Sequence, residues 1–63
     1  MKVRDFAKKI RHASLPFSVG IRRGTKYVEH IDDVKNLETN SCYLNETVNS
    51  IVFYETLTII NIK

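Results

Sequence analysis

The sequence predicts an α+β fold in which one N-terminal amphipathic helix packs on a small antiparallel sheet of about four strands. Three patterns lead to this prediction: a helical stripe of apolar residues near the start, two alternating segments after it, and two densely apolar segments at the end. Helices and strands that follow one another in separate blocks are typical of α+β domains. Because the chain has only 63 residues, we expect residues 1–63 to form a single domain.

The helical stripe occupies the first ten residues, where apolar side chains recur at the spacing i, i+3, i+4 and i+7. Its members are Val3, Phe6, Ala7 and Ile10. The helix is expected to end by Leu15-Pro16, since the residue before a proline is disfavoured in the α region. Residues 17–21 then alternate and predict a strand, Arg23-Gly24 predicts a turn, and residues 26–30 predict a returning strand. Phe17 and Tyr27 are expected in the core.

In the middle of the chain the spacing of the apolar residues changes. Ile31, Val34 and Leu37 are three residues apart, which predicts a short helical turn that Asp32 and Asp33 would favour near its start. Residues 38–41 are polar and predict a loop. Residues 42–44 fit either a short extended piece or more loop, and the sequence leaves this open.

The closing segments, residues 48–54 and 57–62, are rich in branched and aromatic side chains and predict a hairpin. Simple alternation puts apolar side chains on both faces of both strands. It groups Ile51 with Phe53 against Val48, Val52 and Tyr54, and Leu57 with Ile59 against Thr58, Ile60 and Ile62. A sheet wetted on one face should alternate more cleanly, so we expect cover on both faces.

This excess of apolar strand surface predicts a partner. A core this small rarely supplies more than about 3–5 kcal/mol, and oligomerisation is a common remedy. We therefore expect a homodimer, or a surface that binds another protein, with Phe53, Tyr54, Ile60 and Ile62 at the interface.

The charge is unevenly distributed along the chain. The net charge is +3, yet residues 1–26 hold eight basic and one acidic residue, a net of +7, while residues 27–63 hold two basic and six acidic residues, a net of −4. An alternative function follows, in which the basic residues contact the phosphates of a nucleic acid or an acidic partner. The candidate contacts are Lys8, Lys9 and Arg11 on the helix and Arg22 and Arg23 at the turn. The competing interpretation is an ordinary solvated helix face and a charged loop.

Several classes of function are not expected. No apolar run approaches the roughly 20 residues of a membrane span, and no signal peptide is recognisable. The single Cys42 excludes an internal disulfide and fits a cytoplasmic protein. His12, His30 and Cys42 lack zinc-site spacing, so we expect no metal and no cofactor. Residues 29–33 combine two aspartates with His30, but acids at a helix start explain them better than catalysis, and we do not expect an enzyme or a small-molecule substrate.

The second half of the chain resembles small α+β accessory proteins of phages and prophages of Gram-positive bacteria. The resemblance rests on Ile31-Asp32-Asp33-Val34 and on the closing pattern of Val48, Ser50, Ile51, Tyr54, Leu57, Ile59 and Ile62. These are mainly core positions, and the basic N-terminal half departs from the pattern. The resemblance implies a protein of the host cytoplasm that binds and inhibits or redirects a host protein, such as a component of antiviral defence.

Overall fold

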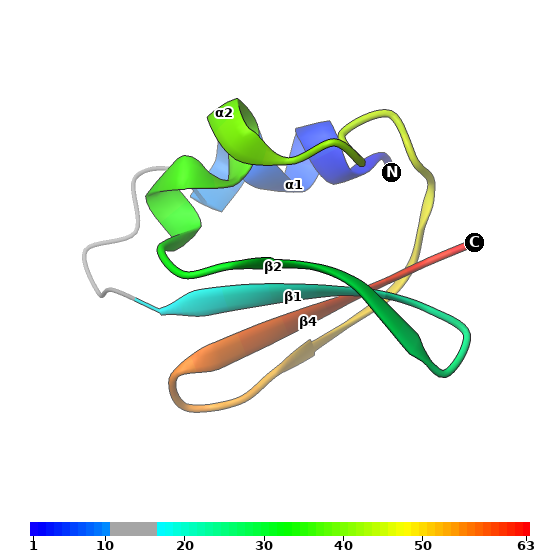
Figure 1. Cartoon of the computed structure of the whole chain (residues 1–63). Coiled ribbons are helices and arrows are strands. Elements are labelled where there is room, and N and C mark those ends of the chain that lie inside the picture. The colour runs from blue at the N-terminus through cyan, green and yellow to red at the C-terminus, as the bar shows by residue number, and fades with distance from the viewer. Residues whose placement is uncertain (11–16) are drawn as a thin grey trace.

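The computed structural model describes residues 1–10 and 17–63 and confirms the α+β layout (Figure 1). A four-stranded sheet carries the helical segments on one side. The elements in chain order are α1 (Val3–Ile10), β1 (Ser18–Arg23), β2 (Lys26–Ile31), the 3-10 turn η1 (Val34–Asn36), α2 (Leu37–Asn40), β3 (Val48–Phe53) and β4 (Leu57–Ile62). No helix among the described residues is both long enough and apolar enough to cross a membrane.

The sheet is mixed rather than wholly antiparallel, which corrects one part of the predicted architecture. Its strand order is β2-β1-β4-β3. The outer pairs, β1 with β2 and β3 with β4, are antiparallel hairpins, but the central strands β1 and β4 are parallel. Turn residues reveal hairpins because they act locally. The way in which two hairpins join depends on contacts between residues about 40 positions apart in the sequence, and turn residues do not predict such contacts.

Helix α1 buries the predicted stripe of Val3, Phe6 and Ala7 against the sheet. Its first free N–H groups are satisfied by the loop before β3, because the carbonyls of Glu46 and Leu44 accept from Val3 and Arg4 at 3.0 and 2.9 Å. The predicted end of the helix at Leu15-Pro16 lies outside the described residues.

The connection from β2 to β3 adds to the helical layer. Asp33 caps η1 by accepting a hydrogen bond from the Lys35 N–H at 2.9 Å, and Val34 and Leu37 are buried in the core that α1 shares with the sheet. The loop predicted for residues 38–41 is wrong in part, since α2 continues to Asn40. Residues 42–44 are not a strand.

The core lies between the helical layer and one face of the sheet. Its sheet side consists of Val19, Ile21, Ile31, Ile60 and Ile62. The turn between β1 and β2 is formed by the two residues after Arg23. The first of them, Gly24, has φ +64°, a backbone conformation that two-residue hairpin turns favour. This confirms the turn predicted at Arg23-Gly24.

Candidate binding surface

The sheet has one covered face and one open face. The helical segments lie on the covered face, and Figure 1 shows no helix or loop of residues 1–10 and 17–63 across the other. Residues directly opposite one another in neighbouring strands share a face, so the pairings Gly20 with Ile59 and Ile59 with Val52 define the open face. The registers and the alternation of the strands assign Ser18, Gly20, Arg22, Tyr27, His30, Ser50, Val52, Tyr54, Leu57, Ile59 and Asn61 to it.

The middle of the open face is apolar. Ile59 is only 6% exposed although no helix covers it, because neighbouring side chains close over it. Around it, Tyr27, Val52 and Tyr54 are 55%, 39% and 60% exposed, respectively, and Leu57 is half-buried. We call Tyr27, Val52, Tyr54, Leu57 and Ile59 the open-face patch. Solvated apolar side chains grouped in this way are typical of interaction surfaces.

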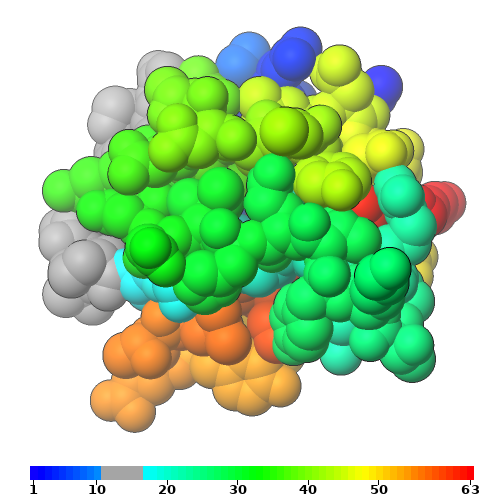
Figure 2. Space-filling model, viewed as in Figure 1, coloured from blue at the N-terminus to red at the C-terminus, as the bar shows by residue number. Residues whose placement is uncertain are grey.

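A groove of about 710 Å³ lies at the β2 side of this patch and is lined by Ser18, Tyr27, Val28, Glu29, His30, Thr56 and Leu57. Figure 2 shows β1 in cyan at the bottom of a depression between β2 in green and the start of β4 in orange. Gly20 helps to shape it, because a Cβ built on Gly20 would come within 3.3 Å of Cε1 of the Tyr27 ring. The absence of a side chain at Gly20 therefore lets the Tyr27 ring lie close to the sheet.

The other end of the open face is polar and internally hydrogen-bonded. Arg22 donates from Nε to Oδ1 of Asn61 at 2.8 Å, and Asn61 donates from Nδ2 to the hydroxyl of Ser50 at 3.0 Å. The guanidinium of Arg22 also lies 5.8 Å from the centre of the Tyr27 ring, within cation–π range. This ladder crosses β1, β4 and β3 and gives the apolar patch a polar border.

The residues predicted for an interface separate into two groups. Phe53 and Tyr54 are exposed, as an interface requires, with Phe53 at 64%. Ile60 and Ile62 are not, since they lie in the core of the chain itself with 0% and 3% exposure. The assignment of these two isoleucines to a partner surface is therefore corrected: α1 and its neighbours cover their face of β4.

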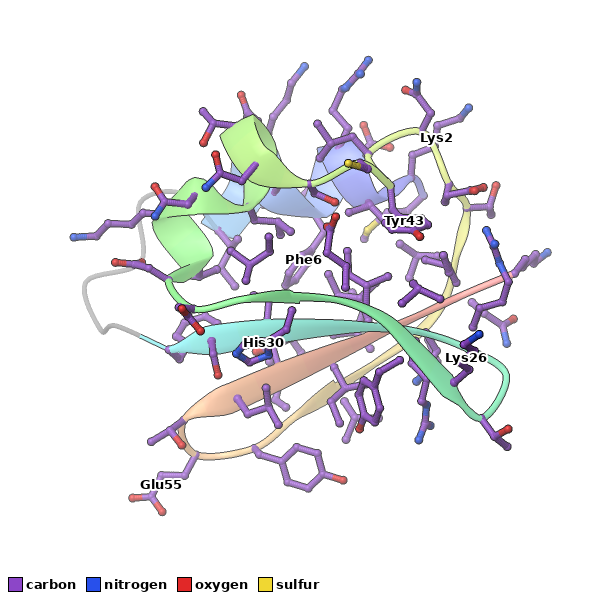
Figure 3. All side chains as sticks on the ribbon, viewed as in Figure 1. Lys2, Phe6, Lys26, His30, Tyr43 and Glu55 are labelled. Atoms are coloured by element: carbon purple, nitrogen blue, oxygen red, sulfur yellow. The ribbon has the colours of Figure 1, made fainter. Side chains whose placement is uncertain are left out.

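Phe53 lies at the rim of the covered face rather than on the open face. It pairs with Thr58 in the register of β3 and β4, and its ring centre is 6.2 Å from that of Phe6. Figure 3 shows Phe6 extending from α1 toward the sheet. Phe53 thus contacts the core with one side and water with the other.

The structure does not assemble the predicted basic residues into one cluster. Lys8 and Lys9 are exposed in the last turn of α1, whereas Arg22 and Arg23 lie at the far end of β1 and diverge. Arg22 belongs to the open face. Arg23 forms an ion pair with Glu46, 2.7 Å from its Nη2 to Oε1, and donates from Nε to the carbonyl of Lys63. Arg11 lies outside the described residues.

The acidic segment around His30 is also dispersed. Glu29 faces the covered side and accepts the N–H of Cys42 at 3.0 Å, whereas His30 shares a face with Gly20 and lies 3.1 Å from the carboxylate of Asp32. Asp33 caps η1, as a helix-start acid should. In the part of the chain that the structure describes, no three His, Cys, Asp or Glu side chains come together as metal ligands. The segment is better explained by capping than by chemistry.

Sequence reasoning did not identify Tyr27 and the groove beside it. It placed Tyr27 in the core, but this side chain is half-exposed on the open face. The available signal was Gly20, a glycine inside an alternating strand, which often marks a close approach by a neighbouring group. No protein-family model, curated protein or solved structure matches this chain. Its function must therefore be inferred from the surface.

Proposed function

We propose that the chain is a small protein-binding module that captures another protein on the open face of its sheet. The observation that carries this proposal is the open-face patch, an apolar centre without a cover from the helical layer. Tyrosines, enriched at the centres of interfaces, stand on both sides of Ile59. Binding, rather than catalysis, is the activity that such a surface performs.

The groove gives the surface a shape as well as an area. An apolar or aromatic side chain of the partner would enter beside Tyr27 and Leu57, where the lining is mainly apolar. The ladder of Arg22, Asn61 and Ser50 would form part of the polar rim. A buried anchor within a polar border is the usual arrangement of a protein–protein interface.

The resemblance to phage accessory proteins supports the same class of function, because it implies a chain that inhibits or redirects a host protein in the cytoplasm. Under this proposal the inhibitor acts by occupying a surface of its target. The open face supplies the contact, and the basic outer side of α1 remains available to orient the encounter with an acidic partner.

Site-specific photo-crosslinking tests the proposal. A photoreactive phenylalanine analogue placed at Tyr27 should give discrete adducts with one partner in the producing cell, and the same analogue at exposed Thr39 of α2 should not. Once the partner is purified, the double variant Tyr27→Lys, Val52→Lys should weaken its affinity at least 100-fold. Adducts equally strong at Thr39, or an unchanged affinity in the double variant, would refute an open-face site.

Nucleic-acid binding is the second candidate, and one observation favours it. The outer side of α1 exposes Lys2, Arg4, Lys8 and Lys9 beside the single carboxylate of Asp5. Against it, Arg23 is engaged by Glu46 and Arg22 faces the opposite side of the sheet. Among residues 1–10 and 17–63, a phosphate backbone would therefore meet one short cationic helix rather than a continuous track of basic side chains.

A further inference from the structure

The two edges of the sheet differ in a way that the open face does not explain. The β2 edge carries Lys26, Glu29 and His30, and a register shift interrupts its pairing with β1. Charges and irregularities of this kind discourage edge-to-edge association. The β3 edge, with the sequence VNSIVF, has no charge and no proline and is rich in branched and aromatic residues. Its pairing with β4 also shifts register, between Val48 and Ser50, but the stretch from Ser50 onward has none of these protections.

Only part of the β3 edge is open. At its start the N-terminal segment already pairs with it, since the N–H of Val48 donates to the carbonyl of Met1 at 2.8 Å and Lys2 bridges Thr47. At its end the Tyr54 N–H donates to the carbonyl of Leu57 at 2.7 Å. This bond fixes the alternation, so Val52 and Tyr54 direct their main-chain groups toward β4 while Ile51 and Phe53 direct theirs outward. The open stretch is residues 50–54.

We propose that two copies of the chain pair antiparallel along residues 50–54 of β3, with Val52 on a two-fold axis, to form one continuous eight-stranded sheet. In this register Val52 lies opposite Val52 of the second copy, and Ile51 lies opposite Phe53 of the second copy. The outward N–H and C=O groups of Ile51 and Phe53 then form the hydrogen bonds of the new ladder. A two-fold contact uses the same surface from both copies, as most homodimers do.

In this pairing the second copy covers Phe53, the most exposed apolar side chain of the β3 edge. Phe53 contacts Phe6 on one side only, and the pairing brings Ile51 of the second copy to its solvent side. An aromatic ring opposite a β-branched residue is a favourable cross-strand pair. By symmetry, both copies gain this contact.

Charge complementarity identifies a second copy of the chain as the strand that pairs with the β3 edge. Beyond Tyr54 the next residue is Glu55, which extends away from the molecule in Figure 3, and antiparallel pairing carries it toward the Lys2 segment of the other copy. Lys2 and Glu55 lie at opposite ends of the edge, so an antiparallel arrangement brings opposite charges together at both ends. The overlap itself contains no charge that would repel its copy.

Disulfide trapping tests the register. In a Cys42→Ser background, which removes the native exposed thiol, Val52→Cys should oxidise to a covalent dimer. Directly opposed residues in such a pair have Cβ atoms about 4.5–5.5 Å apart, close enough for a disulfide after small adjustments. The control is Tyr27→Cys, which lies on the opposite edge strand at a position that is more exposed than Val52 (55% against 39%), and it should remain monomeric. Oxidation of Val52→Cys no faster than Tyr27→Cys would overturn the pairing.

Sedimentation equilibrium tests the dimer itself. The wild-type chain should show a reversible monomer–dimer equilibrium, Phe53→Leu should retain it, and Phe53→Lys should weaken it at least tenfold with an unchanged circular dichroism spectrum. A wild-type chain that is monomeric up to about 0.5 mM, or a Phe53→Lys variant that dimerises as well as wild type, would refute the proposal. The experiment uses the purified chain alone, so its outcome is independent of the partner sought on the open face.

Discussion

Arg22 and Arg23 show how one step along a strand changes the environment of a side chain. The two adjacent residues point to opposite faces, one toward Asn61 and the ring of Tyr27, the other toward Glu46 and the C-terminal carbonyl. Read as a sequence, the pair looks like a single cationic tip. In the fold, each guanidinium holds together elements about 40 residues apart, and these internal contacts compete with the binding of a phosphate.

Gly24 is the residue at which the backbone itself sets the requirement. Its φ of +64° disfavours residues with a side chain, and no atom lies within 4 Å of a Cβ built there. Gly24→Ala should therefore lower the free energy of unfolding by about 1–2 kcal/mol for conformational reasons alone. Gly24→Asn should lose less, because asparagine tolerates this region better. Urea titrations of both variants would check this, and equal losses would contradict the assignment of the cost to the positive φ of residue 24.

Asp5 should make the stability of the fold depend on pH. Its carboxylate accepts the backbone N–H of Lys2 at 3.0 Å, and this hydrogen bond, aided by nearby positive charges, lowers the pKa of Asp5 below the ordinary value of 3.8. A pKa that is lower in the folded state gives stabilisation that is present above about pH 4 and lost as the pH falls through the folded-state pKa.

We therefore expect Asp5→Ala to lower the melting temperature at pH 7 and to flatten the fall in melting temperature between pH 4 and pH 2. Thermal melts followed by circular dichroism at a series of pH values would measure both effects. Glu55→Gln removes the same charge from an exposed turn without removing a helix cap, and at a concentration low enough for the chain to be monomeric it should leave the pH 7 melting temperature unchanged. An Asp5→Ala variant that melts like wild type at pH 7 would contradict the capping role.

At the scale of elements, the sequence predicted each local structure that depends on period or turn chemistry. The stripe on α1, the turn at Gly24 and the closing hairpin are all confirmed. Val48 is an instructive miss. Alternation grouped it with Val52, but the register shift between Val48 and Ser50 turns its side chain toward the core.

The interface prediction failed in part for a related reason. Alternation correctly separated Ile59 from Ile60 and Ile62, but it cannot say which face the helices cover. Because β1 pairs in parallel with β4, Ile60 lies beside Ile21 in the middle of the core. The candidate surface at Tyr27 depends on the same long-range register, and so only Gly20 gave a local hint of it.

Ile60 and Val52, on adjacent strands, should respond very differently to truncation. Ile60→Ala leaves a cavity in the core and should cost about 3 kcal/mol. In a domain with roughly 3–5 kcal/mol in total, about 0–2 kcal/mol would remain, so the unfolded fraction at 25 °C would rise to between about 3% and about 50%. Val52→Ala, on the open face, should cost less than about 1 kcal/mol. Chemical denaturation would measure the free energy of unfolding of both variants. Similar losses would contradict the assignment of Ile60 to the core and of Val52 to the open face.

At the scale of the whole molecule, the described residues form two layers, a helical layer and a sheet, and leave the second face of the sheet uncovered. The helical segments lie on a single face of the sheet, and the termini of the described chain lie near each other at one end (Figure 1). A chain built in this way has three surfaces to offer: the cationic outer side of the helices, the β3 edge and the open face. The basic residues of α1 lie on the outer side of the helices. The excess of apolar strand residues lies on the β3 edge and the open face.

These surfaces lead to a prediction about nucleic acids. With the hairpin arginines engaged, α1 alone presents cations together in the part of the chain that the structure describes. A titration into labelled single- and double-stranded oligonucleotides should therefore show no binding tighter than about 10 μM at physiological salt. At low salt any residual binding should have a shallow salt slope, since few phosphates are neutralised. Fluorescence anisotropy at two salt concentrations would measure both quantities.

Paired variants locate whatever binding remains. Lys8→Glu with Lys9→Glu should abolish low-salt binding, because the two side chains are exposed on the outer side of α1. Arg23→Gln should preserve it, because the wild-type guanidinium is already paired with Glu46. Submicromolar binding at physiological salt with a steep slope that depends on Arg22 and Arg23 would reverse the order of the two proposed functions. It would mean that these arginines leave their partners in the fold to contact phosphates, and that the open face serves a different purpose.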